Sequence, residues 1–202
     1  MTKKLWEASN EIKNKSNLFR YEKFLKENYN YNISKKFNKL LKWSINNPSD
    51  FWSSIWDFTK IKGQKKLKFK YKKNLINSKF LIGSKLNFAE NLLSKNDNTN
   101  AITFISENGY RDVRTWRQLN INTGKIINFF NKIKIKPKDR IAAYLPNIAE
   151  TVECFLATSS IGAIWSSCSP DFGINGVIER FSQIKPKLLI VADRYYYNGK
   201  EI

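Results

Sequence analysis

Apolar residues recur every three or four positions through the first part of the chain, up to about residue 58. This spacing places them on one face of amphipathic helices, and many of them are aromatic. The pattern is interrupted around Pro48, after which Ser49 or Asp50 could cap a new helix. The sequence therefore predicts a helical region with an aromatic core, to which we assign no chemistry. The three apolar stripes lie at 19–29, 33–45 and 51–58.

From Ala101 the pattern changes to strands that alternate with helices. Two short runs flank Glu107-Asn108-Gly109, which is a strong signal for a β-hairpin. Thr115 and Gln118 have the spacing of a capping box, so a helix is expected to follow. Strands joined by helices of about ten or more residues form parallel sheets with right-handed crossovers. After hairpin strands at 101–105 and 110–114, we expect helices at 116–132, 148–160 and 175–183 and strands at 140–145, 163–167 and 187–192.

The fold class that these patterns predict is α/β, in two parts. A mainly helical amino-terminal module is expected over residues 1–95, and the first part of a parallel-sheet domain over residues 96–202. A parallel sheet that stops after a few strands has open edges, which disfavours independent stability. We therefore expect the α/β domain to be incomplete in this chain.

Three loops follow the carboxyl ends of the expected parallel strands, where ligands of such sheets bind. Ser169-Pro170-Asp171 offers hydroxyl and carboxylate acceptors ahead of a helix N-terminus that could receive an anion or a nucleotide. An ordinary turn with an N-cap explains the same residues. In the last loop a tyrosine could stack on a base while Lys200 pairs with a phosphate, although packing within the loop also explains the tyrosines. The loops lie at 145–147, 169–173 and 193–200.

The composition excludes several kinds of catalytic and metal site. The chain has no His, so it contains no His-dependent nucleophile system and no His-ligated metal. Two cysteines, Cys154 and Cys168, are too few for a disulfide framework or a four-thiolate zinc site. The eight glycines are scattered singly. The sequence contains neither of two glycine-rich phosphate-binding motifs, Gly-x-x-x-x-Gly-Lys-Ser/Thr and Gly-x-Gly-x-x-Gly. We therefore assign no catalytic residue and no metal ligand.

A net charge of +19 raises the possibility of a nucleic-acid or anionic-surface partner. However, 29 of the 36 basic residues are Lys, and Lys, Asn and Ile together make up 76 of 202 residues, the bias expected of AT-rich codons. The segment 60–73 contains eight lysines and no acid. Its part at 67–71 predicts a short exposed strand, and a phosphate or RNA groove with interleaved aromatic residues is the alternative. We favour codon bias as the explanation of the high net charge, and keep an RNA-binding or anionic-surface-binding module as an alternative function.

No targeting or membrane segment is expected. Residues 1–26 include Glu7 and Glu11 and lack the apolar stretch of a signal peptide. The longest uncharged stretch, 154–170, is shorter than the roughly 20 apolar residues that a membrane span needs. We therefore expect no membrane partner, two free cysteines and a cytoplasmic location.

Four stretches of the sequence are distinctive: Trp43–Phe58, Leu86–Leu93, Gly162–Gly173 and Arg180–Lys187. They resemble the adenylate-forming ligases, in particular the acetoacetate-CoA ligases of their acetyl-CoA synthetase branch. The resemblance runs from about residue 35 onward and covers the amino-terminal third of that family. The acetyl-CoA synthetases differ, because they usually have Gly-Gly-Phe where this chain has Pro170-Asp171-Phe172. The chain departs from the acetoacetate type at 80–82, where Trp-Phe-Pro is usual.

The resemblance implies an ATP-dependent ligation in which acetoacetate, ATP and CoA give acetoacetyl-CoA, AMP and pyrophosphate, with Mg²⁺ on the phosphates. Acetate or another short acyl acid is the alternative substrate. The family's ATP phosphate loop and catalytic lysine have no counterpart in the 202 residues. We therefore expect an amino-terminal fragment that is inactive alone and needs a carboxy-terminal portion as partner. The residues implied to contact CoA are Ser169, Pro170, Asp171, Tyr197 and Lys200.

Overall fold

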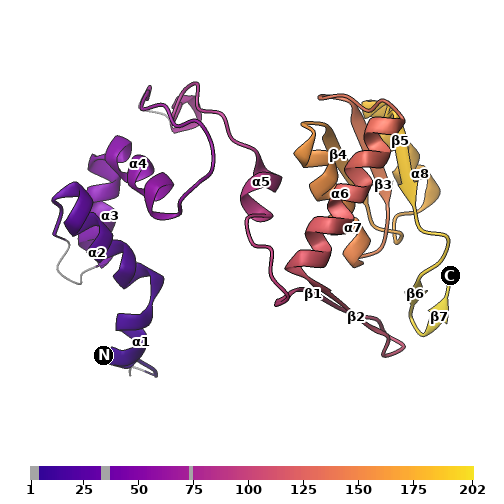
Figure 1. Cartoon of the computed structure of the whole chain (residues 1–202), viewed down its shortest axis with the longest axis horizontal. Coiled ribbons are helices and arrows are strands. Elements are labelled where there is room, and N and C mark those ends of the chain that lie inside the picture. Colours follow the sequence, from indigo (N-terminus) through magenta and orange to yellow (C-terminus); the bar gives the residue numbers. More distant parts are fainter. Residues whose placement is uncertain (1–4, 33–36, 73–74) are drawn as a thin grey trace. The chain divides into compact units, whose positions relative to one another are not determined.

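A computed structural model describes residues 5–32, 37–72 and 75–202. The chain divides into two compact units, residues 1–86 and 87–202, each of which is treated separately below (Figure 1). The division falls ahead of the boundary expected near residue 95. Ile33 of the second apolar stripe and Lys73 of the lysine run lie outside the described residues.

The first unit is built from helices, as the apolar stripes predict. Tyr21 and Leu25 pack with Leu40 and Trp43 in its core, and the Tyr21 hydroxyl lies 2.6 Å from the buried Ser54 hydroxyl. The helices are α1 (Asn10–Lys15), α2 (Asn17–Tyr29), α3 (Phe37–Asn46) and α4 (Pro48–Phe58), with a 3₁₀ turn η1 at Leu75–Asn77.

The start of α4 differs from the prediction. Neither Ser49 nor Asp50 caps this helix, because Asn47 is the N-cap residue and Pro48 already occupies the first helical turn. Proline suits the first helical position, since its fixed φ is helical and the N–H it lacks would have no partner inside the helix. The proline that interrupts the apolar pattern therefore begins the next helix.

Residues 64–72 and 78–85 form an irregular antiparallel ribbon, which we call the lysine ribbon. Gln64 with Lys85, and Lys70 with Lys79, each exchange a pair of backbone hydrogen bonds of 2.8–3.0 Å. The short exposed strand expected at 67–71 is thus reduced to the isolated bridge at Lys70, and serine hydroxyls accept hydrogen bonds from the backbone N–H groups of Lys66 and Lys72.

The second unit has the predicted alternation of strands and helices. The capping box is present, since Gln118 N donates to Thr115 Oγ1 and Thr115 N donates to Gln118 Oε1. The elements are α5 (Phe88–Leu92), β1 (Asn100–Ile105), β2 (Arg111–Thr115), α6 (Trp116–Lys132), β3 (Arg140–Tyr144), α7 (Ala149–Ser160), β4 (Ile164–Cys168), α8 (Ile174–Ile184), β5 (Leu188–Val191), β6 (Tyr196–Tyr197) and β7 (Lys200–Glu201).

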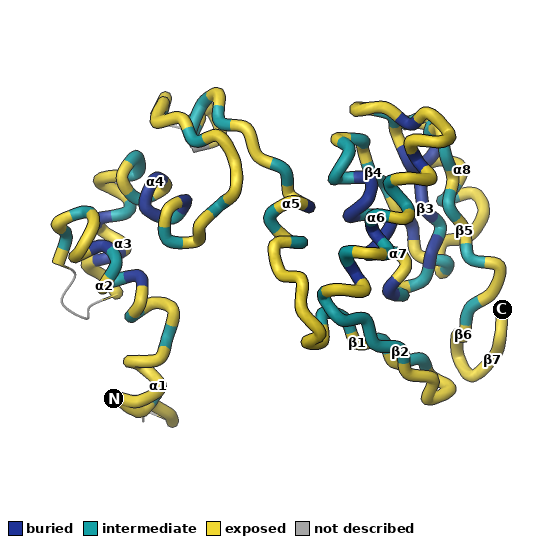
Figure 2. Tube along the Cα trace, in the orientation of Figure 1, coloured by how far each residue is buried: buried dark blue, intermediate teal, exposed yellow. Residues whose placement is uncertain are grey.

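A parallel sheet of order β4-β3-β5 is the centre of the second unit, which confirms the α/β prediction. Ile141 of β3 packs against Phe130 of α6 and Ala157 of α7 on one face. Ala142 of the same strand packs against Phe181 of α8 on the other face. Figure 2 shows β3 as the buried strand of this layer. The helices thus cover both faces and leave the strand ends for the loops.

Candidate functional site

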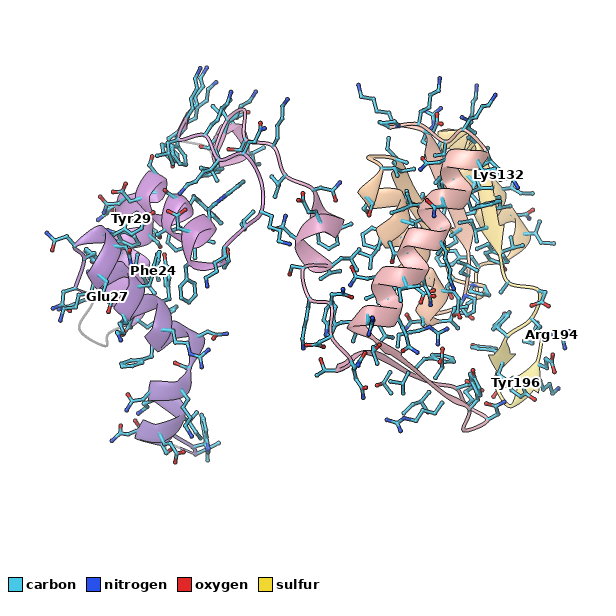
Figure 3. The ribbon with its side chains drawn as sticks, in the orientation of Figure 1. Phe24, Glu27, Tyr29, Lys132, Arg194 and Tyr196 are labelled. Carbon is cyan, nitrogen blue, oxygen red and sulfur yellow. The ribbon has the colours of Figure 1, made fainter. Side chains whose placement is uncertain are left out.

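A cavity of about 810 Å³ opens between the β1–β2 hairpin, the loop after β3 and the last residues of the chain. Its walls are mostly apolar, with Ile102 and Phe104 from β1 and Pro146 and Val152 from the region around α7. The carboxyl end of β3 thus opens into a hollow of ligand size, as expected for a parallel sheet. The polar and aromatic residues that line it include Glu107, Arg194, Tyr195, Tyr196 and Glu201. Figure 3 labels Arg194 and Tyr196 of this group.

The Ser169–Asp171 segment after β4 forms a turn, not a helix cap. Ser169 Oγ donates to Asp171 Oδ2 at 2.8 Å. The N-cap residue of α8 is Gly173, which has no side chain to cap with, so the N-cap interpretation is wrong. Tyr144 is the last residue of β3, and its hydroxyl lies 2.7 Å and 3.0 Å from the carbonyl oxygens of Pro170 and Phe172. This side chain therefore attaches the turn after β4 to the end of β3.

The segment at 193–200 is more ordered than the loop that the sequence predicts. Tyr196 pairs with Glu201 and Tyr197 with Lys200 in a two-stranded hairpin, β6–β7. Asn198 (φ 51°) and Gly199 (φ 73°) form its turn, and positive φ at both central positions is typical of a type I′ turn. The Asn-Gly dipeptide was therefore a readable signal that the sequence analysis missed.

The two cross-strand pairs of this hairpin lie on opposite faces, because side chains alternate along a strand while cross-strand partners share a face. Tyr196 and Glu201 both line the cavity. Tyr197 and Lys200 form the other pair, and neither is among the residues that line the cavity. Both are exposed, and no acidic side chain within the described ranges forms an ion pair with Lys200.

Tyr195 connects the two groups of predicted site residues. Partial desolvation, followed by the charge of Asp171 and the nearby Tyr144 and Tyr197, raises the pKa of the Tyr195 hydroxyl above its ordinary value. The structure thus joins Ser169 with Asp171 and pairs Tyr197 with Lys200. Among the described residues no hydrogen bond or ion pair joins these two groups, and Tyr195 is near enough to Asp171 and Tyr197 for both to raise its pKa.

Three further features bear on the chemistry of the chain: possible metal ligands, possible membrane-crossing helices and the two cysteines. Across residues 5–32, 37–72 and 75–202, no group of three His, Cys, Asp or Glu side chains is arranged to hold a metal ion. None of the helices in those ranges has the length and apolarity that a membrane crossing requires. Cys154 and Cys168 are both free and buried, as expected. Burial, together with the charges of Glu153 and Glu150, raises the pKa of the Cys154 thiol to about 11, which keeps the thiol protonated at neutral pH.

Comparison with known proteins identifies related sequences and a related structure. The family described as AMP-binding enzyme matches residues 90–201. Acetoacetyl-coenzyme A synthetase from Rhizobium meliloti (strain 1021) is 36% identical over 97% of this chain and 30% of its own length. Acetoacetyl-CoA synthetase from Xenopus tropicalis is 40% identical over 82% of this chain and 25% of its own length.

The structural comparison agrees with these matches. The structure of acetoacetyl-CoA synthetase from Streptomyces lividans has a TM-score of 0.90 and 26% sequence identity, and the match covers 99% of this chain and 32% of that chain. The chain therefore spans about 25–30% of the length of these two curated relatives.

Proposed function

Because the chain belongs to the AMP-binding enzyme family, we propose that it is part of an ATP-dependent acetoacetate-CoA ligase and that it contributes the site for the CoA nucleotide. The observation that carries this proposal is the identity of 36–40% to curated acetoacetyl-CoA synthetases. The complete reaction joins acetoacetate to the CoA thiol through an acyl-adenylate, with AMP and pyrophosphate as products. We propose acetoacetate rather than acetate as the acyl substrate, because these two relatives are named as acetoacetyl-CoA synthetases.

The CoA site that we propose lies on the face of the β6–β7 hairpin that carries Tyr197 and Lys200. Lys200 would pair with the 3′-phosphate, since its ammonium group is exposed and has no acidic partner among the described residues. Tyr197 offers a ring beside that charge. The turn at Ser169–Asp171 presents a hydroxyl and a carboxylate that can accept hydrogen bonds from an adenine amino group.

The residues of this chain do not account for the ATP and Mg²⁺ sites. No metal-binding group is present in the parts of the chain that the structure describes, and no glycine-rich phosphate loop is present in the sequence. We therefore place the phosphate loop, the Mg²⁺ ligands and the adenylating lysine outside these 202 residues, and infer that the chain alone has no ligase activity. The two buried thiols support a reducing, cytoplasmic location.

Calorimetric titration of the full chain with CoA and with 3′-dephospho-CoA tests the site. We expect CoA to bind more tightly, and Lys200→Gln to remove the difference between the two ligands. Lys132→Gln is the matched control, because Lys132 is also exposed but lies in the last turn of α6. A folded chain that gives no heat with CoA, or a preference for CoA that Lys200→Gln leaves intact, would refute the proposed site.

The acyl substrate needs a separate experiment. The chain would be combined with the remaining portion of an acetoacetyl-CoA synthetase, and AMP release would be measured with acetoacetate and with acetate. We expect release that depends on both parts and is faster with acetoacetate. Equal rates with both acids would favour a general short-chain acyl-CoA synthetase, and no release from a folded, associated pair would count against the ligase assignment.

A further inference from the structure

Four lysines of the first ribbon strand lie on one face. The backbone N–H groups of Lys66, Lys70 and Lys72 donate to the second strand, and the Lys68 carbonyl accepts from it, at 2.7–3.0 Å. Every second residue therefore bonds to the same neighbour, and in an extended strand such residues have their side chains on the same face. Lys79 joins this face as the cross-strand partner of Lys70.

The opposite face of the ribbon carries its aromatic residues. Phe69 stacks on Tyr71 at 5.9 Å between ring centroids, Tyr71 contacts Phe80 at 5.5 Å, and Phe80 contacts Trp52 of α4 at 5.6 Å. Lys65, also an odd-numbered residue, pairs with a carboxylate of α4 at 2.7 Å. This face thus attaches the ribbon to α4, and the aromatic rings do not lie between the lysines of the other face.

The lysine face has no compensating charge. Residues 60–85 contain ten lysines and no acidic residue. Lys66, Lys68, Lys70, Lys72 and Lys79 are all exposed, and none has an acidic partner in the described part of the chain. Like charges directly across a strand pair destabilise it, as Lys70 and Lys79 must do here. An external anion would relieve this repulsion.

We propose that the lysine face of the ribbon is a docking surface for anionic lipid headgroups. Each lysine close to an anionic membrane surface contributes about 1 kcal/mol of attraction, so five lysines on one face favour such a surface without a membrane-spanning helix. Nucleic acids fit the face less well. Proteins bind single-stranded nucleic acids by stacking aromatic side chains on the bases, and they read duplex grooves with Arg side chains. The five lysines share their face with neither aromatic residues nor Arg.

Vesicle co-sedimentation of the full chain tests the docking surface. Phosphatidylcholine vesicles would be compared with vesicles that also contain phosphatidylserine. The ribbon variant is Lys68→Gln, Lys70→Gln, Lys72→Gln and Lys79→Gln. The control variant is Lys26→Gln, Lys42→Gln, Lys125→Gln and Lys132→Gln, which removes the same charge from exposed positions elsewhere. Thermal unfolding of each variant checks that it remains folded.

We expect binding only to vesicles with phosphatidylserine, and a loss of roughly fivefold in the partition coefficient for each ribbon lysine removed. The control variant should retain most of the binding. Three results would overturn the proposal: no binding of the wild-type chain at low salt, equal losses in the two variants, or tighter binding of an RNA homopolymer than of the vesicles through the same lysines. The last result would assign the face to nucleic acid.

Discussion

The carboxylate of Glu107 accepts a hydrogen bond of 2.9 Å from the backbone N–H of Gly199, although 92 residues separate them. This contact joins the turn of the β1–β2 hairpin to the turn of the β6–β7 hairpin, on either side of the cavity. A hydrogen bond to a charged group contributes about 1.5–3 kcal/mol when it is well shielded, and less at an exposed site such as this one. Glu107 therefore holds the last hairpin in place.

Replacing Glu107 with Ala should release the β6–β7 hairpin without unfolding the unit. We expect faster amide hydrogen exchange over residues 195–202 and little change in the exchange of β3, which is in the buried centre of the sheet. Glu179→Ala is the control, because Glu179 is exposed on α8 and its carboxylate makes no contact with the hairpin. Unchanged exchange over 195–202 in Glu107→Ala would show that the contact does not hold the hairpin.

Arg114 is the centre of a partly buried charge cluster that connects β2 to α7. It pairs with Asp112, with Glu150 at 2.7 Å and with Glu153 at 3.2 Å, and Glu153 is only 3% exposed. Removing one partner of a buried ion pair costs about 3–5 kcal/mol, because the remaining charge is left uncompensated. We expect Arg114→Met to lower the free energy of unfolding by roughly this amount in urea denaturation.

Two comparisons test this explanation. Arg117→Met changes an exposed arginine near the start of α6 and should have little effect. Glu153→Gln in the Arg114→Met background should recover part of the stability, since it removes the unpaired charge. If the double variant were no more stable than Arg114→Met alone, lost packing and not the buried charge would explain the destabilisation.

Thr123 of α6 is 1% exposed, and its hydroxyl is the only buried side-chain oxygen or nitrogen without a hydrogen-bond partner among the described residues. Thr158 of α7 is equally buried, but its hydroxyl donates to the Cys154 carbonyl at 2.8 Å. A buried polar group without a partner costs about 1–3 kcal/mol. Thr123→Val should therefore stabilise the chain by about 1 kcal/mol, and Thr158→Val should destabilise it by a similar amount. Thermal unfolding of the pair measures both, and the same sign for both would contradict this account.

Local signals explain how much of the fold could be predicted. The capping box of Thr115 and Gln118 involves residues three positions apart, so its spacing alone identifies it. The parallel sheet follows from the alternation of strands and helices, for which topology rules leave few options. The Asn198–Gly199 hairpin was equally local, but its strands of two residues are too short to show an alternating pattern.

The site could be predicted only in part, since its geometry depends on contacts between distant segments. The contact of Glu107 with Gly199 has no signature in the spacing of either residue. The last hairpin separates the Tyr196–Glu201 pair, which lines the cavity, from the Tyr197–Lys200 pair, and this register is a property of the folded chain. The proposed roles of Ser169, Asp171 and Lys200 rest on family resemblance.

Acid should weaken the sheet through Asp139, which lies just before β3. Lys187, followed by the backbone N–H of Lys136, holds the pKa of the Asp139 carboxyl below its ordinary value of 3.8, with the Lys187 ammonium group at 2.7 Å. A carboxyl whose pKa is lower in the folded chain stabilises the fold above its unfolded pKa, and this contribution is lost as the pH falls through the folded value. Lys187→Met should therefore be less stable than the wild type at neutral pH, and the difference should shrink below about pH 4, as urea denaturation across pH would show. Lys132→Met should show no such convergence, and a constant gap for Lys187→Met at every pH would mean that packing of the lysine side chain, not the charge of Asp139, stabilises this end of the sheet.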